Sequence, residues 1–242
     1  MCDLKLSIII PCYNEGEKLI SNIIKINKYM ENNLSFATYE IIVVNDGSTD
    51  NTAEIILNNK EKFQNTRLIS YAPNKGKGGA VKCGVEDANG EWILFMDADL
   101  STYLSAIRTT FENMDYSNII IGSRRHKESN IIKKQGFVRN IVGKCCVILT
   151  NLITHVDLSD TQCGFKAMKT SLAKKIVAKQ TINTWAFDVE WLFIAKLNNE
   201  KIKEIPVTWE NDSDSKVSTI KSSIKFFIDL LKIVKNKKSY RF

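Results

Sequence analysis

The first half of the chain alternates short apolar runs with helical patterns, and this alternation constrains the fold more than any other feature. Five runs rich in β-branched residues predict strands at residues 6–11, 39–46, 67–72, 91–99 and 118–123. Apolar residues recur with helical spacing between them, near 17–31, 51–61, 78–89 and 103–114. Such alternation predicts an α/β fold with a mostly parallel central sheet flanked by helices. Ligands then bind beyond the carboxyl ends of the strands.

The pattern weakens after residue 125. A helical stretch is expected at about 134–154 and another near 187–198, with one strand in "KIKEIPVTW" at 201–209. A chain of 242 residues with 44% hydrophobic content is long enough for one large core. We expect a globular domain over 1–215 and a separate basic tail over 216–242.

The net charge of +7 is concentrated in that tail, where eight Lys and Arg residues face one aspartate, Asp229. This excess of basic residues favours a polyanionic partner, which could be nucleic acid, anionic lipid or a phosphorylated substrate. The tail also has the pattern of an amphipathic helix that rests on the domain or on a membrane. Its apolar positions are Ile220, Ile224, Phe227, Leu231 and Val234, and its basic flank is Lys221, Lys225, Lys232 and Lys235.

No apolar stretch reaches the roughly 18–20 residues that cross a bilayer, and the N-terminus does not resemble a signal peptide. We therefore expect a cytoplasmic protein. Six cysteines without a C-x-x-C pair, with only two histidines, argue against a structural zinc site.

Two aspartates follow the apolar strand in "EWILFMDADLST", residues 91–102. In an extended strand Asp97 and Asp99 would point to one face, with the small Ala98 turned away. Two carboxylates at such a short distance repel each other unless a cation lies between them. Mg²⁺ or Mn²⁺ suits such oxygen ligands. The alternative is an exposed acidic turn in which Ser101 or Thr102 caps the next helix.

Asp46 follows another buried strand in "VVNDGSTDNT", residues 43–52. Helix capping accounts for Ser48, Thr49 and Asp50. It does not account for Asp46, whose carboxylate could accept hydrogen bonds from a nucleobase.

The segment "NKGKGGA", residues 74–80, matches neither the nucleoside triphosphatase loop nor the dinucleotide fingerprint. Amides at Gly78 and Gly79 could face an anion, with Lys75 or Lys77 supplying charge. A merely flexible loop is the other reading.

The order of these motifs, "IIIPCYNE", "VVNDGSTDNT" and "NKGKGGAVKCGVEDANGEWILFMDADL", resembles the family 2 inverting glycosyltransferases with the GT-A fold. The second half is similar to their polyprenyl-phosphate branch, which includes dolichyl-phosphate glucosyl- and mannosyltransferases. The segments that carry this likeness are "GSR", "RNIVGKCCVILTNLI", "DTQCGFKAMK" and "FDVEWL".

The resemblance implies a donor site for a nucleoside-diphosphate sugar, with Mg²⁺ or Mn²⁺ as cofactor. Matching positions for the donor are Pro11, Tyr13, Glu15, Asp46, Lys75, Asp97, Ala98 and Asp99. Asp97 and Asp99 would bind the metal and the diphosphate. Ser101 stands where some relatives have a third metal ligand, although serine is a poorer ligand than their glutamine.

On the acceptor side, the resemblance implies that Arg124, Arg139 and Lys216 hold the lipid phosphate. A guanidinium can bind phosphate oxygens with two parallel hydrogen bonds. The alternative is a generic basic surface.

"DTQCGFK" resembles a family segment that lines the acceptor side of the sugar pocket, and this resemblance implies a place there for Asp160 and Gln162. Asp160 would orient the acceptor or act as base, although a phosphate acceptor is already anionic and needs no strong base. Asp188 either binds substrate or caps a helix.

These residues predict transfer of a hexose from a UDP- or GDP-sugar to a polyprenyl phosphate, with inversion. "DTQCGFK" and "WAFDVEW" resemble the glucosyl more than the mannosyl relatives, which favours UDP-glucose. The enzyme would touch the cytoplasmic face of a membrane, by itself or through a membrane partner protein, and would not bind nucleic acid. One alternative is transfer to a sugar hydroxyl with Asp160 as base. Another is a non-catalytic protein that binds nucleotide sugars.

Overall fold

The computed structural model describes residues 4–63, 65–133, 136–211 and 219–242. The main sheet consists of β1 (Leu6–Cys12), β2 (Tyr39–Asp46), β3 (Thr66–Tyr71), β4 (Trp92–Met96), β5 (Ile119–Ser123), β7 (Phe165–Lys169) and β8 (Ile202–Pro206). A small second sheet pairs β6 (Asn130–Lys133) with β9 (Thr208–Glu210). The helices are α1 (Gly16–Asn33), α2 (Thr52–Asn58), α3 (Lys77–Asp87), α4 (Ser105–Phe111), α5 (Phe137–Thr154), α6 (Thr170–Lys179), α7 (Phe187–Leu197) and α8 (Thr219–Lys235).

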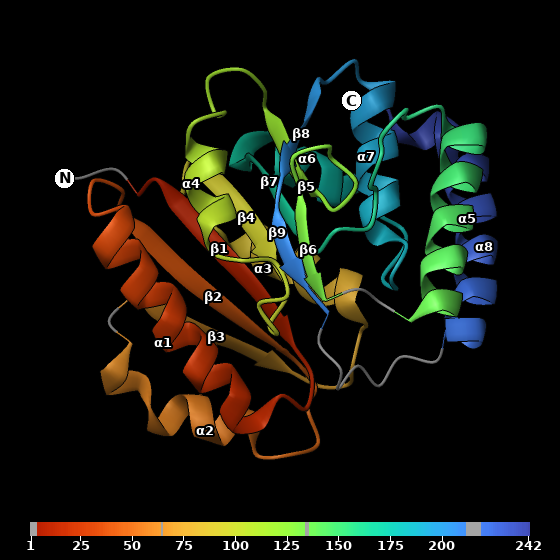
Figure 1. Cartoon of the computed structure of the whole chain (residues 1–242). Helices are drawn as coiled ribbons and strands as arrows, with labels where there is room; N and C mark the ends of the chain where they lie inside the picture. The colour runs from red at the N-terminus through yellow and green to blue at the C-terminus, as the bar shows by residue number, and fades with distance from the viewer. Residues whose placement is uncertain (1–3, 64, 134–135, 212–218) are drawn as a thin grey trace.

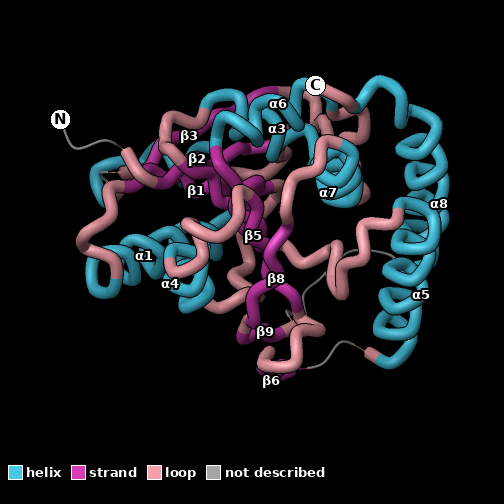
Figure 2. Tube along the Cα trace, turned by 90° about the horizontal axis from the view of Figure 1, so that it is seen from above, coloured by secondary structure: helices cyan, strands magenta, loops and turns pink. Residues whose placement is uncertain are grey.

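The main sheet has the order β3-β2-β1-β4-β7-β5-β8 and carries helices on both faces (Figures 1 and 2). Strand β1 shows why both faces are covered. Ile8 and Ile10 pack into the layer under α1 and α4, while Ile9 packs into the layer under α3, and all three are buried. Successive side chains of a strand point to opposite faces, so a continuous apolar run requires burial on both sides.

The first half of the molecule confirms the predicted alternation. Strands β1, β2, β3 and β4 pair in parallel, with helices α1, α2 and α3 between them in the chain. Strand β4 is shorter than expected, because the chain leaves the sheet after Met96.

The second half differs from the prediction at two elements. Strand β7 lies antiparallel between β4 and β5 in the middle of the sheet, and α6 follows it directly. Neither was expected, because β7 includes the fully buried Lys166, whose charge breaks the apolar pattern of a central strand. The single strand expected at 201–209 is divided, because β8 pairs with β5 while β9 pairs with β6 in the other sheet.

The basic tail forms α8, and of the two surfaces expected for its apolar stripe, the domain and a membrane, the domain is mainly contacted by other residues of the helix. Phe226, Leu230 and Ile233 are buried in the same core layer as α7. Three residues of the predicted apolar stripe are exposed, with Ile224 at 60%, Phe227 at 44% and Leu231 at 51%, while Val234 is half-buried and the side chain of Ile220 lies outside the described part. The expected boundary between residues 215 and 216 lies outside the described residues.

Helices α5 and α8 lie side by side and form the outermost layer at one edge, beyond α7 (Figures 1 and 2). Within the described ranges, no helix combines the length and the apolar content that a membrane span requires.

Candidate active site

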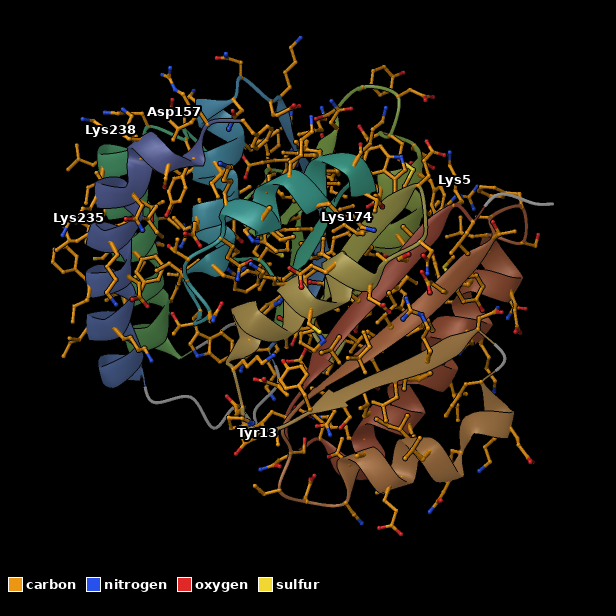
Figure 3. The ribbon with its side chains drawn as sticks, turned by 180° about the vertical axis from the view of Figure 1, so that it is seen from behind. Lys5, Tyr13, Asp157, Lys174, Lys235 and Lys238 are labelled. Atoms are coloured by element: carbon orange, nitrogen blue, oxygen red, sulfur yellow. The ribbon has the colours of Figure 1, made fainter. Side chains whose placement is uncertain are left out.

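The loops that follow β1, β2 and β4 meet at one end of the sheet, where Tyr13 lies exposed (Figure 3). Asn14 connects the first two loops, because its backbone N–H donates to Ser48 Oγ over 3.0 Å. Asn14 Oδ1 in turn accepts the N–H of Thr49 over 2.9 Å. Ser48 and Thr49 therefore join two loops instead of capping α2. We call this end of the sheet, with the loops that follow its strands, the rim.

The other predicted residues of the first loop belong to this rim. Pro11 lies near the end of β1, and the N–H of Glu15 donates to Thr52 Oγ1 over 3.2 Å at the start of α1. Thr52 in turn is held by Asp50, which accepts its N–H over 3.0 Å.

Asp46 is buried at the end of β2 and organises the segment that leads into α3. Its Oδ1 accepts the hydroxyl of Tyr71 over 2.9 Å and the N–H of Lys75 over 2.8 Å. Its Oδ2 accepts the N–H of Gly76 over 2.9 Å. These bonds use three of the roughly four acceptor positions of a carboxylate. The predicted contact with a nucleobase would use the remaining one.

The start of α3 is not the free anion cradle that the glycines suggested. Gly76 has a φ of +87°, which a residue with a side chain rarely adopts. The N–H groups of Gly78 and Gly79 both point to the carbonyl oxygen of Asn183, at 2.9 and 3.4 Å. Lys75 lies with its Nζ 4.3 Å from the centre of the Tyr71 ring.

Asp97 and Asp99 lie in a turn after β4, and this corrects the expected extended geometry. Leu100 has a φ of +55°, and its N–H donates to the Asp97 carbonyl over 3.3 Å. The turn fits closely against Gly164, where any side chain would collide with the Asp97 carboxylate. The capping alternative is wrong, because α4 begins only after Leu104.

A lysine that the sequence only suggested faces these carboxylates. Lys77 Nζ lies 2.6 Å from Asp97 Oδ1 and 4.7 Å from the centre of the Trp185 ring. Burial raises the pKa of Asp99, and the negative charge of Asp97 raises it further. The N–H of Ser101 donates to Asp99 Oδ1 over 2.9 Å.

This arrangement fits a divalent cation. Two carboxylates share one turn, and the pKa of Asp99 is raised first by burial and then by the negative charge of Asp97, which a bound cation would offset. The described part of the chain holds no group of three or more His, Cys, Asp or Glu side chains placed for a metal ion. Oxygens of Ser101 or of the donor would have to complete the coordination.

Arg124 and Asp160 form a buried pair at the end of β5. Asp160 is 1% exposed and accepts Arg124 Nε over 2.6 Å, Nη2 over 2.8 Å and the backbone N–H over 3.0 Å. Burial acts to raise the pKa of Asp160, but the Arg124 charge and these bonds outweigh it and bring the pKa to about 2. A carboxylate with that pKa is a weak base. Gln162 adjoins the pair, and its N–H donates to Asp160 Oδ1 over 3.2 Å.

Asp188 has a partner that the sequence did not reveal. Its Oδ2 lies 3.2 Å from the fully buried Lys166 Nζ, which also donates to the Cys163 carbonyl over 2.6 Å. Asp188 is not the N-cap of α7, because that position belongs to Ala186. Glu190 points to other partners, among them Tyr240, whose hydroxyl donates to Glu190 over 2.5 Å.

Two predicted phosphate ligands cannot be placed in the same way. Arg139 belongs to the first turn of α5, and its side chain lies outside the described part. Lys216 falls among residues 212–218, which are also outside it.

Comparison with known proteins identifies the family of the chain. The family described as Glycosyl transferase family 2 matches residues 7–177. The chain belongs to glycosyl transferase family 2. It is therefore a glycosyltransferase, as the motifs predicted.

Curated relatives of this glycosyltransferase are similar along nearly the whole chain. A dolichyl-phosphate beta-glucosyltransferase of Dictyostelium discoideum is 36% identical over 96% of this chain and 74% of its own length. The human protein of the same name is 32% identical over 94% of this chain and 74% of its own length.

Solved structures show that the glycosyltransferase has the predicted GT-A fold. Glucosyl-3-phosphoglycerate synthase from Mycobacterium tuberculosis, in complex with Mn²⁺ and UDP-glucose, matches with a TM-score of 0.67 at 15% identity, over 96% of this chain and 79% of that one. TarS of S. aureus matches with a TM-score of 0.62 at 20% identity, over 96% of this chain and 65% of that one.

Proposed function

We propose that this glycosyltransferase moves glucose from UDP-glucose to a polyprenyl phosphate such as dolichyl phosphate, with inversion at the anomeric carbon. The observation that carries the proposal is the 36% identity, over 96% of the chain, to a dolichyl-phosphate beta-glucosyltransferase. The geometry of the rim supports it on both the donor and the acceptor side.

On the donor side, we propose that the rim residues Pro11, Tyr13, Glu15, Asp46 and Lys75 contact the nucleoside. The diphosphate would then lie beside Asp97 and Asp99, which would hold Mg²⁺ or Mn²⁺ between them. Bound there, the ion would stabilise the negative charge that builds on the departing diphosphate. Lys77 lies 2.6 Å from Asp97 and would add a second positive charge at the same place.

On the acceptor side, Arg124 is the residue best prepared to meet a phosphate. Asp160 engages only Nε and Nη2 of its guanidinium, and the side chain is 24% exposed. Asp160 leaves Nη1 unused, and no hydrogen bond from Nη1 to another described residue is present, so its donors could meet phosphate oxygens. Arg139 and Lys216 would join it. Holding the acceptor in line with the sugar supplies much of the acceleration, because the reactants no longer have to find each other.

The state of Asp160 disfavours transfer to a sugar hydroxyl. That reaction needs a base to remove the hydroxyl proton, whereas the pKa of Asp160 is held at about 2 by Arg124. A phosphate acceptor is already anionic and needs no base. In this proposal Asp160 positions Arg124, while Gln162 and Asp188 shape the pocket.

The test is transfer of labelled glucose from UDP-glucose to dolichyl phosphate, in detergent with Mn²⁺ or Mg²⁺, followed by extraction of the lipid. We expect label in the lipid, little from GDP-mannose, and none after chelation of the metal. Label that appears only on added oligosaccharide would contradict the proposal. We further propose that the reaction takes place at the cytoplasmic face of a membrane, where nucleotide sugars are made.

A further inference from the structure

Helices α5 and α8 expose an unusual share of large apolar side chains. Among the described residues, sixteen large hydrophobic side chains are exposed, and eight of them lie on these two helices. They are Ile141, Ile148, Leu149 and Leu152 on α5, and Ile224, Phe227, Ile228 and Leu231 on α8. We call this set the α5–α8 face. Single exposed apolar residues are ordinary, but a continuous group marks a contact surface.

The eight side chains form one stripe on each helix. On α8, Ile224, Phe227, Ile228 and Leu231 follow the spacing that keeps residues on one side of a helix. Buried residues of α8, such as Phe226 and Leu230, occupy the opposite side.

Helix α5 repeats the arrangement. Ile141, Ile148 and Leu152 are exposed, while Val147 and Thr150 are buried opposite them. Both helices pack side by side in one outer layer (Figure 2). Because their buried residues face inward, both exposed stripes face away from the protein.

The charged residues that α5 and α8 themselves carry are nearly all basic. On α5 and α8 the only acidic residue is Asp229, which is buried. Lysines 225, 232 and 235 line an open hollow of about 480 Å³ between α8 and residues 181–184. Asp229 offsets Lys232, since its Oδ1 lies 2.9 Å from Lys232 Nζ. Lys225 and Lys235 are exposed and form no ion pair with another described residue, so an external anion could approach them.

We infer that the α5–α8 face docks on an anionic phospholipid bilayer, with its apolar side chains in the outer acyl region and its lysines at lipid phosphates. Helices that carry an apolar side and a basic flank lie in the plane of the bilayer surface in this way. A second copy of the chain fits less well, because the lysine flanks would repel each other.

The position of the α5–α8 face suits the proposed function. The reason for docking rests on that function, because it supposes a lipid acceptor. Both helices begin near the end of the molecule where β1, β2 and β3 end, and both run away from it (Figure 1). Docking would bring the rim with Arg124 next to the bilayer surface. A polyprenyl phosphate would then reach the rim without leaving the membrane.

The test uses flotation of the full chain with vesicles of phosphatidylcholine, with and without phosphatidylglycerol, and with no donor present. Leu231→Asn should lower binding to the anionic vesicles at least tenfold, because a leucine no longer enters the apolar layer. The matched control is Leu57→Asn on α2, since Leu57 is 52% exposed and Leu231 is 51% exposed. The control should bind like the wild type.

Charge is tested separately. Lys235→Glu should weaken binding to anionic vesicles about tenfold, because it reverses one charge near the surface. Lys174→Glu, on a different side of the molecule, should leave it unchanged (Figure 3). Phe227→Trp should show blue-shifted fluorescence on these vesicles, whereas Phe36→Trp should not.

The inference is overturned if the wild type does not float, if both leucine variants lose binding equally, or if Leu231→Asn instead dissolves a dimer in solution. A thermal shift with UDP-glucose and Mn²⁺, measured on the same proteins, separates the two proposals. A rise in melting temperature with UDP-glucose and Mn²⁺, without vesicle binding, refutes only the proposal that the α5–α8 face docks on a bilayer. Vesicle binding that Leu231→Asn abolishes, without any donor shift, refutes the proposed function alone.

Discussion

Two carboxylate–cation pairs border the rim, and they differ in burial although their shortest N–O distances are both 2.6 Å. The Asp97 side chain is 31% exposed and faces a single lysine, Lys77. The Asp160 side chain is 1% exposed and receives three hydrogen bonds from Arg124. Distance alone therefore does not distinguish a replaceable partner from a fixed one.

Burial decides the difference between these pairs. A charge near solvent that loses its partner is stabilised by water, so Asp97 can exchange Lys77 for another cation at small cost. A buried charge that loses its partner has no such replacement. The Lys77–Asp97 pair thus suits a binding site, and the Arg124–Asp160 pair suits a support that holds one guanidinium in place.

The largest effect is expected from breaking the buried pair. Asp160→Asn should lower the free energy of unfolding by about 2–3 kcal/mol, because the neutral amide loses the interactions with Arg124 that bring the pKa of the buried Asp160 from 3.8 to about 2. Asp97→Asn should change it by less than about 1 kcal/mol. Urea denaturation at neutral pH measures both, and equal losses would contradict the contrast between the pairs.

The second effect concerns catalysis. Asp99→Asn should lower glucose transfer at least about 100-fold, because charge on the departing diphosphate loses its stabilisation. The melting temperature should stay close to that of the wild type. Asp115→Asn, at an exposed aspartate, is the control. Undiminished transfer by Asp99→Asn would remove the metal assignment.

A third effect follows from pH. The folded pKa of Asp160 is about 2 and lies below its ordinary value of 3.8, so this carboxylate stabilises the fold fully above about pH 4. That contribution, roughly 2 kcal/mol, should disappear as the pH falls from 4 towards 2. Urea midpoints of the wild type and Asp160→Asn should therefore converge on acidification. Midpoints that keep a constant separation would show that Asp160 is not the group responsible.

The smallest effect is expected at the exchangeable pair. Lys77→Gln should raise the donor KM about tenfold, since one charged hydrogen bond to the diphosphate is lost. Binding of Mn²⁺ without nucleotide should not weaken, because Lys77 no longer competes for Asp97. Lys82→Gln on the same helix is the control, and its Nζ lies 3.9 Å from Glu86. Weaker Mn²⁺ binding by the Lys77→Gln variant would contradict the idea that the metal ion replaces Lys77 as the partner of Asp97.

The sequence predicted the first four strands and the meeting of their loops at one end of the sheet. Strands β1 to β4 and the loops after them follow from local apolar patterns, and parallel strands bring those loops to one edge. The details of that rim did not follow. Asp97 and Asp99 lie in a turn because Leu100 takes a positive φ, and Asp46 binds the segment that leads into α3.

The pairs formed by Arg124 and by Lys166 depended on contacts between distant residues. Arg124 and Asp160 are separated by 36 positions, and Lys166 and Asp188 by 22. Spacing along the chain cannot show that such groups pair, because pairing depends on where β5, β7 and α7 come together. Lys166 in a central strand violates the apolar pattern, and only its buried partners account for it.

Helix α8 shows most clearly which features follow from the local sequence and which follow from tertiary packing. By itself the sequence determined that residues near 219–235 form a basic helix with apolar residues at helical spacing, because that periodicity is local. It did not determine which side would be buried, because α8 carries apolar residues on two sides. Tertiary packing against α7 decided that Phe226 and Leu230 face the core and that Phe227 and Leu231 face outward.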